Sequence, residues 1–131
     1  MKRIIAILLI LLIWSLSIGA ERYEPMDFEA AGFQQIYTTA YCVGHHTANG
    51  DAVYEGGCAC SPDHIGDVAV IFSMEGEFLG YFFCNDTGKA GGGVRAGNVV
   101  DIYRTDYDRC VAWMTQNPTG KCWIRWIEGE G

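Results

Sequence analysis

Basic side chains are scarce in this chain, which has 9 lysines and arginines against 16 aspartates and glutamates and a formal net charge of −7. Nucleic acids and anionic lipids both reward clustered Lys and Arg. The charge balance therefore argues against nucleic acid as a partner and offers no electrostatic attraction to an acidic membrane surface.

Long apolar runs are also lacking, except at the N-terminus. Lys2 and Arg3 precede an apolar stretch from Ile4 to Ile18 that only two serines interrupt, and the small residues Gly19-Ala20 follow. This pattern is typical of a secretory signal peptide. The stretch is shorter than the roughly 20 residues that span a bilayer comfortably, and no cysteine follows it directly as a lipid-attachment site. We expect a signal peptide at 1–20 and a secreted or cell-envelope protein, which is membrane-bound only if this segment stays uncleaved.

Internal repeats and low-complexity segments are absent too, so a repeat architecture is not expected. Removal of the first 20 residues leaves 111, with a net charge of −9 because Lys2 and Arg3 are lost. That length allows one compact domain, which we expect to be monomeric. Residues 21–35 are acidic and irregular, and predict an N-terminal arm or linker before a domain at 36–131.

Cysteine is plentiful by comparison, with six residues in the part that would be exported: Cys42, Cys58, Cys60, Cys84, Cys110 and Cys122. An even number in a small exported domain indicates disulfides, although the sequence does not select among the 15 complete pairings. A metal site is the alternative, because His45, His46 and His64 lie near Cys58 and Cys60. The single residue between those two cysteines does not match the usual spacing of zinc ligands. We therefore expect no metal and no cofactor.

The middle and C-terminal parts of the chain alternate between short strands and glycine-containing loops. Thr, Tyr and β-branched residues predict the first strand, and polar or glycine-rich segments predict the loops. The expected strands are 36–43, 67–73, 77–84, 98–103 and 122–127; the expected loops are 44–57, 74–76 and 89–97. Residues 67–84 form a hairpin in this interpretation.

One helix is expected at 107–115, with Thr105 as its N-terminal cap and Asn117-Pro118 as its end. In the strand at 122–127, Trp123 and Trp126 should point to opposite faces. Either could stack on a sugar, although core packing is the more common role of tryptophan. Many short strands with one short helix predict a mainly β protein, a small barrel with Greek-key-like crossings.

Two aspartates stand where apolar runs end, at Asp86 in Asn85-Asp86-Thr87-Gly88 and at Asp101 in Val99-Val100-Asp101-Ile102. A carboxylate at the end of a rigid strand, beside a glycine-rich segment that a polymer can approach, is well placed for proton transfer. The alternative is that both are turn residues, since Asp often begins turns.

The order of short motifs resembles the 3D domain of the double-psi β-barrel superfamily, whose relatives include membrane-bound lytic transglycosylase A, rare lipoprotein A and expansins. The motifs are Thr39-Ala40-Tyr41, His46-Thr47-Ala48-Asn49-Gly50, Ser61-Pro62-Asp63-His64-Ile65, Asp86-Thr87-Gly88 and Gly97-Asn98-Val99-Val100-Asp101-Ile102-Tyr103. The resemblance covers roughly residues 37–127. It implies a six-stranded double-psi barrel with one or two short helices, stapled here by disulfides.

The resemblance also implies peptidoglycan, or another cell-wall polysaccharide, as the partner. A lytic transglycosylase cuts the β-1,4 bond between N-acetylmuramic acid and N-acetylglucosamine with one acidic residue, which corresponds to Asp101, and Asp86 would support it. The remaining substrate-binding positions that the resemblance implies are Thr39, Tyr41, Thr47, Gly88 and His64.

Two departures from the family separate the alternatives. Ser61 stands where the family has the first of its three aspartates, near His64, and the glycine-rich loop is longer at 89–93. The missing aspartate favours a second hypothesis, a non-catalytic wall-binding or wall-loosening module like the expansins. Hydrolysis by two carboxylates also remains open, as does a disulfide-stapled scaffold or inhibitor.

Overall fold

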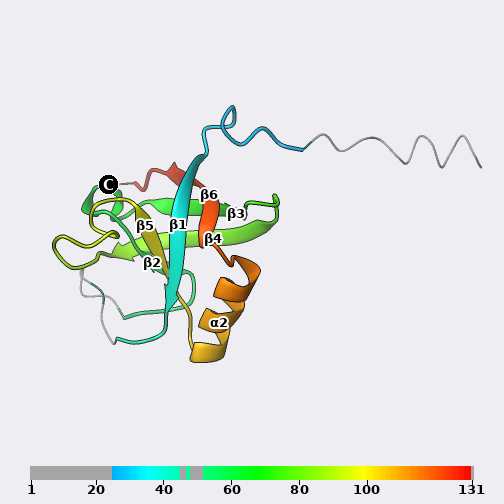
Figure 1. Cartoon of the computed structure of the whole chain (residues 1–131). Coiled ribbons are helices and arrows are strands. Elements are labelled where there is room, and N and C mark those ends of the chain that lie inside the picture. Colours follow the sequence, from blue (N-terminus) through cyan, green and yellow to red (C-terminus); the bar gives the residue numbers. More distant parts are fainter. Residues whose placement is uncertain (1–24, 45–46, 48–51, 131) are drawn as a thin grey trace, which may run out of the picture.

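Six strands form a closed ring of pairings in the computed structural model of the chain, which describes residues 25–44, 47 and 52–130. The elements in chain order are β1 (Gln34–Tyr41), β2 (Gly57–Ala59), the short 3-10 helix η1 (Pro62–His64), β3 (Val68–Ser73), β4 (Phe78–Asp86), β5 (Val99–Tyr103), α2 (Tyr107–Gln116) and β6 (Lys121–Ile127). The expected mainly β architecture is confirmed (Figure 1). The expected signal peptide at 1–20 lies outside the described residues.

The strands follow the order β1-β5-β2-β4-β3-β6, and β6 pairs with β1 to close the barrel. Two pairs are parallel, β1 with β5 and β2 with β4, and the other four are antiparallel. A parallel pair needs a long crossover connection, and here the chain travels through most of the domain between β1 and β5. These crossovers bring segments that are distant in sequence to neighbouring positions on one wall.

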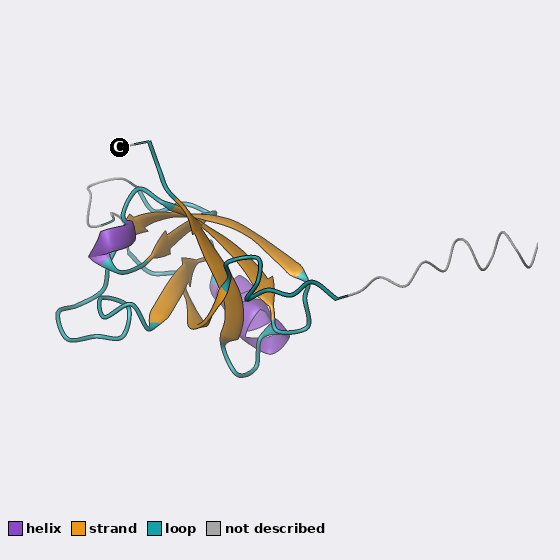
Figure 2. Cartoon of the chain, turned by 90° about the horizontal axis from the view of Figure 1, so that it is seen from above, coloured by secondary structure: helices purple, strands orange, loops and turns teal. Residues whose placement is uncertain are grey.

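Alternate residues of each strand fill the barrel, as the period of two in a strand requires. The inward side chains are mostly small or aliphatic and almost fully buried: Ile36, Thr38, Ala69, Ile71, Phe82, Cys84, Val100, Ile102, Cys122 and Ile124. Helix α2 packs against β1 and contributes Trp113 to this core (Figure 1). In Figure 2, η1 and α2 lie on different sides of the sheet.

The expected helix is confirmed, but its expected cap is wrong. Asp106, not Thr105, is the N-cap, and its carboxylate accepts a hydrogen bond of 2.9 Å from the Arg109 amide. Thr105 instead donates through its amide and its hydroxyl to Glu55, at 2.6 and 2.8 Å. Thr105 does not cap the helix because its hydroxyl is hydrogen-bonded to Glu55, which is distant in the sequence.

Part of the N-terminal segment packs onto the barrel. Residues 27–33 form a turn whose Phe28 ring stacks on Trp123, with centroids 5.3 Å apart, and also contacts Phe72 and Phe33. Trp123 therefore faces the outside of the barrel and Trp126 faces the opposite way, as expected from their spacing. In the described part of the chain, no helix has the length and apolar character to cross a bilayer.

Candidate active site

Four residues on four adjacent strands lie in one row across the outer face of the barrel wall. Thr39 on β1 is in register with Asp101 on β5, Asp101 with Ala59 on β2, and Ala59 with Asp86 on β4. Strands lie about 4.8 Å apart, so the Cα atoms of the two aspartates are roughly 10 Å apart. Ala59, which lies between the two aspartates, has a small side chain and is 6% exposed. We call these four residues the aspartate row.

A β-bulge places Asp86 in this row. Cys58 is in register with Cys84, but Ala59 is in register with Asp86, so β4 contains one extra residue, Asn85. Bulges re-aim side chains and are common next to active sites. The Asn85 side chain is 1% exposed and packs beside Gly57, and its Nδ2 finds no hydrogen-bond partner in the described part of the chain.

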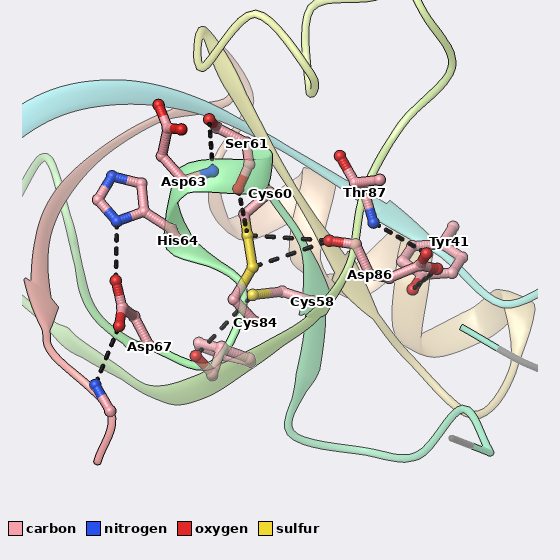
Figure 3. The surroundings of a disulfide bond; sticks show 12 residues. Tyr41, Cys58, Cys60, Ser61, Asp63, His64, Asp67, Cys84, Asp86 and Thr87 are labelled. Carbon is pink, nitrogen blue, oxygen red and sulfur yellow. Dashed lines mark hydrogen bonds and ion pairs between the residues drawn. A yellow bond between two sulfur atoms is a disulfide. The ribbon is translucent and has the colours of Figure 1, made fainter. Parts of the chain in front are cut away.

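A disulfide links the end of β2, which carries Ala59, to β4. Cys60 directly follows β2 and is bonded to Cys84 of β4, with Cα atoms 6.0 Å apart. The Cys60 amide also donates to the Asp86 carbonyl at 3.0 Å. Figure 3 shows the disulfide beside Asp86. Because the bulge would otherwise weaken the pairing, the covalent link holds Asp86 in position relative to Asp101 on the other edge of β2.

Asp101 has an environment that favours the protonated carboxyl group. Burial raises its pKa above the ordinary aspartate value, and the nearby charge of Asp86 acts in the same direction. The Thr39 hydroxyl opposes these effects because it donates to Asp101 Oδ1 at 2.8 Å and so stabilises the carboxylate. With Oδ1 occupied by Thr39, Oδ2 is the oxygen left to exchange a proton with a ligand.

Asp86 is held at both oxygens. The Thr87 amide donates to Oδ1 at 2.8 Å, and the Tyr41 hydroxyl donates to Oδ2 at 3.5 Å, a long hydrogen bond (Figure 3). Burial raises the pKa of Tyr41 above its ordinary value, and the charges of Asp86 and Asp101 raise it further. Tyr41 therefore remains a neutral hydrogen-bond donor, and its ring packs edge-to-face on Tyr103 with centroids 5.4 Å apart.

Thr39 and Tyr41 are thus brought together with both aspartates, whereas the other implied binding residues lie around them. Gly88 follows Asp86 by two residues, and a Cβ atom there would lie 2.9 Å from the Cβ of Val94. Only glycine fits at this position, because the glycine-rich loop folds back so that Val94 packs closely against Gly88. Thr47 is 7% exposed and belongs to the connection between β1 and β2.

His64 lies on the other side of the disulfide from Asp86 and Tyr41 (Figure 3). Its Nδ1 is 3.1 Å from Asp67 Oδ2, and its ring stacks on Trp126 with centroids 4.1 Å apart and an interplanar angle of 7°. Both residues line a cavity of about 200 Å³ that also contacts Val99 and Ser61. The lining also includes Ile36 and Val100, which point into the barrel, but none of the four residues of the aspartate row.

Ser61 performs a local capping role. Its side chain caps η1 by accepting from the Asp63 amide at 3.4 Å, a long hydrogen bond. This short helix then carries His64 to its position against Trp126. Ser61 therefore supports the cavity and adds no third carboxylate to the row.

Two contributors were missed by the sequence analysis. Ala59 lies between Cys58 and Cys60 and ends the three-residue strand β2, and nothing in that short segment predicts a strand. Glu55 gathers Thr105, Arg104 at 3.1 Å and Arg109 at 3.4 Å, which ties the connection before β2 to the start of α2. The sequence around Glu55, a single acidic residue in a polar loop, does not indicate a structural role for it. The adjacent Arg104 and Thr105 are hydrogen-bond donors that a carboxylate could bind, and they are the one clue in the sequence.

No cluster of three or more His, Cys, Asp or Glu side chains suited to a metal ion occurs among residues 25–44, 47 and 52–130. Comparisons with protein-family models and with curated proteins gave no match. The function is therefore inferred from the chain's own residues and their arrangement.

Proposed function

We propose that this chain is an exported peptidoglycan-cleaving enzyme of the lytic transglycosylase type, with Asp101 as its general acid and base. The observation that carries the proposal is the environment of Asp101: a partly buried carboxyl group with a raised pKa, held at one oxygen by Thr39, on the outer face of the barrel wall. A general acid for neutral conditions needs this kind of upward shift.

The fold is compatible with a double-psi barrel of the 3D-domain kind. The two parallel pairs, β1 with β5 and β2 with β4, are each made by a long crossover, and the two crossovers share the same wall. The sequence motifs that resemble the family fall on this wall, at Thr39-Ala40-Tyr41, Asp86-Thr87-Gly88 and the segment that ends in Asp101. We therefore assign the chain to this superfamily as part of the proposal.

The reaction uses one carboxyl group twice. Protonated Asp101 first donates its proton to the glycosidic oxygen, and the bond from that oxygen to the muramic acid C1 breaks. The resulting Asp101 carboxylate then removes the proton from the muramic acid C6 hydroxyl, whose oxygen bonds to C1 and forms the 1,6-anhydro sugar. No water enters the product, and Asp101 ends in its starting protonation state.

The neighbouring groups tune and orient this chemistry. Asp86 raises the pKa of Asp101 through its charge, and the neutral Tyr41 hydroxyl donates toward Asp86 at the same wall. Gly88 follows Asp86 at the end of β4, and the stacked His64 and Trp126 line a separate cavity that could take a further part of the polymer. Peptidoglycan reaches such an enzyme only outside the cytoplasm, in agreement with a signal peptide at 1–20.

The test is product analysis in ¹⁸O-labelled water. The protein should release 1,6-anhydromuropeptides from purified peptidoglycan, without incorporation of ¹⁸O. Release of reducing-end products that carry ¹⁸O would show hydrolysis and would contradict the mechanism. Release of no fragments would contradict the enzymatic proposal.

A second candidate is a non-catalytic wall-binding or wall-loosening module, and the role of Ser61 favours it. The residue that replaces the family's first aspartate is used to cap η1 and supplies no acid. Under this alternative, the protein sediments with insoluble peptidoglycan but releases no soluble fragments from it. Sedimentation without release would select the module over the enzyme.

A further inference from the structure

Of the six cysteines expected to pair, only Cys60 and Cys84 are bonded in this structure, and the four free thiols fall into two different environments. Cys58 and Cys122 have no exposed surface and belong to the barrel core. The Cys58 thiol contacts the Phe82 carbonyl at 3.8 Å, and the Cys122 thiol contacts Thr38 Oγ1 at 3.6 Å and Asn117 Oδ1 at 3.7 Å. Burial raises the pKa of both thiols, that of Cys58 to about 12. A thiol with no exposed surface cannot be reached by a small-molecule disulfide and is inert toward it.

Cys42 and Cys110 meet outside the barrel. Cys42 directly follows β1, and Cys110 lies in the first turns of α2, which packs on that strand. The Arg104 amide donates to the Tyr41 carbonyl at 2.8 Å, so the segment that enters α2 is bound to the end of β1. Ala40 and Cys110 line the same groove, and the Cys42 side chain lies near enough to Cys110 to contribute to the raised pKa of the Cys110 thiol.

We propose that Cys42 and Cys110 form a second disulfide, which ties the end of β1 to α2, while Cys58 and Cys122 remain thiols. The bond would fix the strand that carries Thr39 and Tyr41, but the inference does not depend on what the aspartate row does. It selects one pairing for two of the cysteines from the alternatives that the sequence leaves open.

The oxidation has a definite order because the two thiols differ in exposure. Cys42 is half-buried, whereas Cys110 is buried. The pKa of the Cys110 thiol is raised to about 11, mainly because the thiol is buried and to a smaller extent because the Cys42 side chain is near. The Cys42 thiolate attacks a small-molecule disulfide and forms a mixed disulfide, with release of one thiol. Cys110 then loses its proton and attacks the Cys42 sulfur, which releases the second thiol. Two electrons pass to the oxidant, and two protons leave the protein thiols.

The test is peptide mapping of the full chain after equilibration with glutathione disulfide, alkylation in denaturant and digestion without reduction. We expect one cross-linked peptide pair that contains Cys42 and Cys110, and alkylated Cys58 and Cys122. An alkylated Cys42, or Cys42 bonded to any other cysteine, would overturn the inference.

Two matched variants test the order of the steps. Cys110→Ser should accumulate glutathione on Cys42, because the resolving thiol is missing. Cys42→Ser should leave Cys110 without glutathione over the same time. Equal modification of the two variants would contradict the assigned order, and neither measurement depends on enzymatic activity.

Discussion

At the scale of single residues, Asp101 is the group whose environment is most informative. Burial and the charge of Asp86 raise its pKa, and the Thr39 hydrogen bond limits that rise. The Asp101 carboxylate is therefore less stable in the folded protein than in water. Carboxyl groups with such a raised pKa are found more often at functional sites than at structural ones. Two predictions follow from this balance of effects.

The first concerns stability against pH. Since the pKa of Asp101 is higher in the folded protein than in the unfolded chain, the folded state holds the proton more tightly. The stability from this proton is complete below the unfolded-state pKa and is lost as the pH rises through the folded-state pKa. Asp101→Asn cannot ionise, so its Tm should exceed that of the wild type at pH 7 and approach it near pH 3.

Thermal unfolding at the two pH values measures this difference, and Glu128→Gln is the matched control because Glu128 is exposed beyond the end of β6, outside any helix. The control should change Tm by a similar amount at both pH values. A wild type that is more stable than Asp101→Asn at pH 7 would mean that Asp101 is stabilised as a carboxylate.

The second prediction sets the two neighbours of Asp101 against each other. Thr39→Val removes the donor to Oδ1 and should raise the pKa of Asp101 further, whereas Asp86→Asn removes a negative charge and should lower it. The Asp101 carboxyl carbon, followed by NMR during titration, reports both shifts without any assay of activity. Thr115→Val, an exposed threonine on α2, should change nothing. Shifts of the same sign in the two variants would refute the account.

At the scale of elements, much of the strand pattern was predictable, but the pairing was not. The alternation of apolar residues predicted β3, β4 and β5 closely, because each has one buried face. Strand β2 was missed because its three residues are too few to show the alternation of apolar and polar residues that predicts a strand. Its pairing with both β4 and β5 comes from tertiary structure.

The candidate site shows the same division. Asp86 was predictable because it ends the apolar run of β4, and Thr39 and Tyr41 because of a motif. The expectation that Asp101 also lies at a strand end is wrong, because Asp101 is the middle residue of β5. Their alignment depends on a parallel register between β1 and β5 and on the bulge at Asn85, which non-local contacts determine. No local pattern in the sequence encodes either one.

Glu55 gives a prediction at this scale, because it connects two elements. Burial would raise its pKa, but hydrogen bonds from Thr105 and Arg104 outweigh burial and lower it. Glu55→Ala removes these bonds between the connection before β2 and the start of α2. We expect the free energy of unfolding to fall by about 2 kcal/mol.

Urea unfolding measures this loss, with Glu29→Ala as an exposed control that should change the free energy of unfolding little. Equal stabilities for Glu55→Ala and the wild type would show that the Glu55 contacts do not hold the two segments together.

At the scale of the whole molecule, one polar group inside the barrel connects the helix to the sheet. The Trp113 indole donates to the Thr38 hydroxyl at 2.9 Å, and that hydroxyl donates to the Gly120 carbonyl at 2.9 Å. Thr38 and Trp113 are 1% and 2% exposed. Gly120 has a φ of +75°, and a Cβ atom there would lie 2.9 Å from the Thr38 carbonyl oxygen. The helix, β1 and the turn before β6 are thus joined at one buried point.

Thr38→Val keeps the shape of this side chain but leaves the Trp113 indole without its acceptor. The free energy of unfolding should fall by about 1–3 kcal/mol, because a buried donor would lose its hydrogen bond. The midpoint of urea unfolding should decrease with little change in slope. Thr115→Val serves again as the control, and a Thr38→Val protein as stable as the wild type would show that the hydroxyl adds nothing.

We proposed that Asp101 acts as both acid and base in the cleavage of peptidoglycan, and mass spectrometry of the soluble products from purified peptidoglycan tests this role most directly. The wild type should release 1,6-anhydromuropeptides, and Asp101→Asn, a folded variant if its Tm behaves as predicted, should release them at least about 100-fold more slowly. Asp108→Asn should match the wild type. Anhydro products released at the wild-type rate by Asp101→Asn would contradict the account.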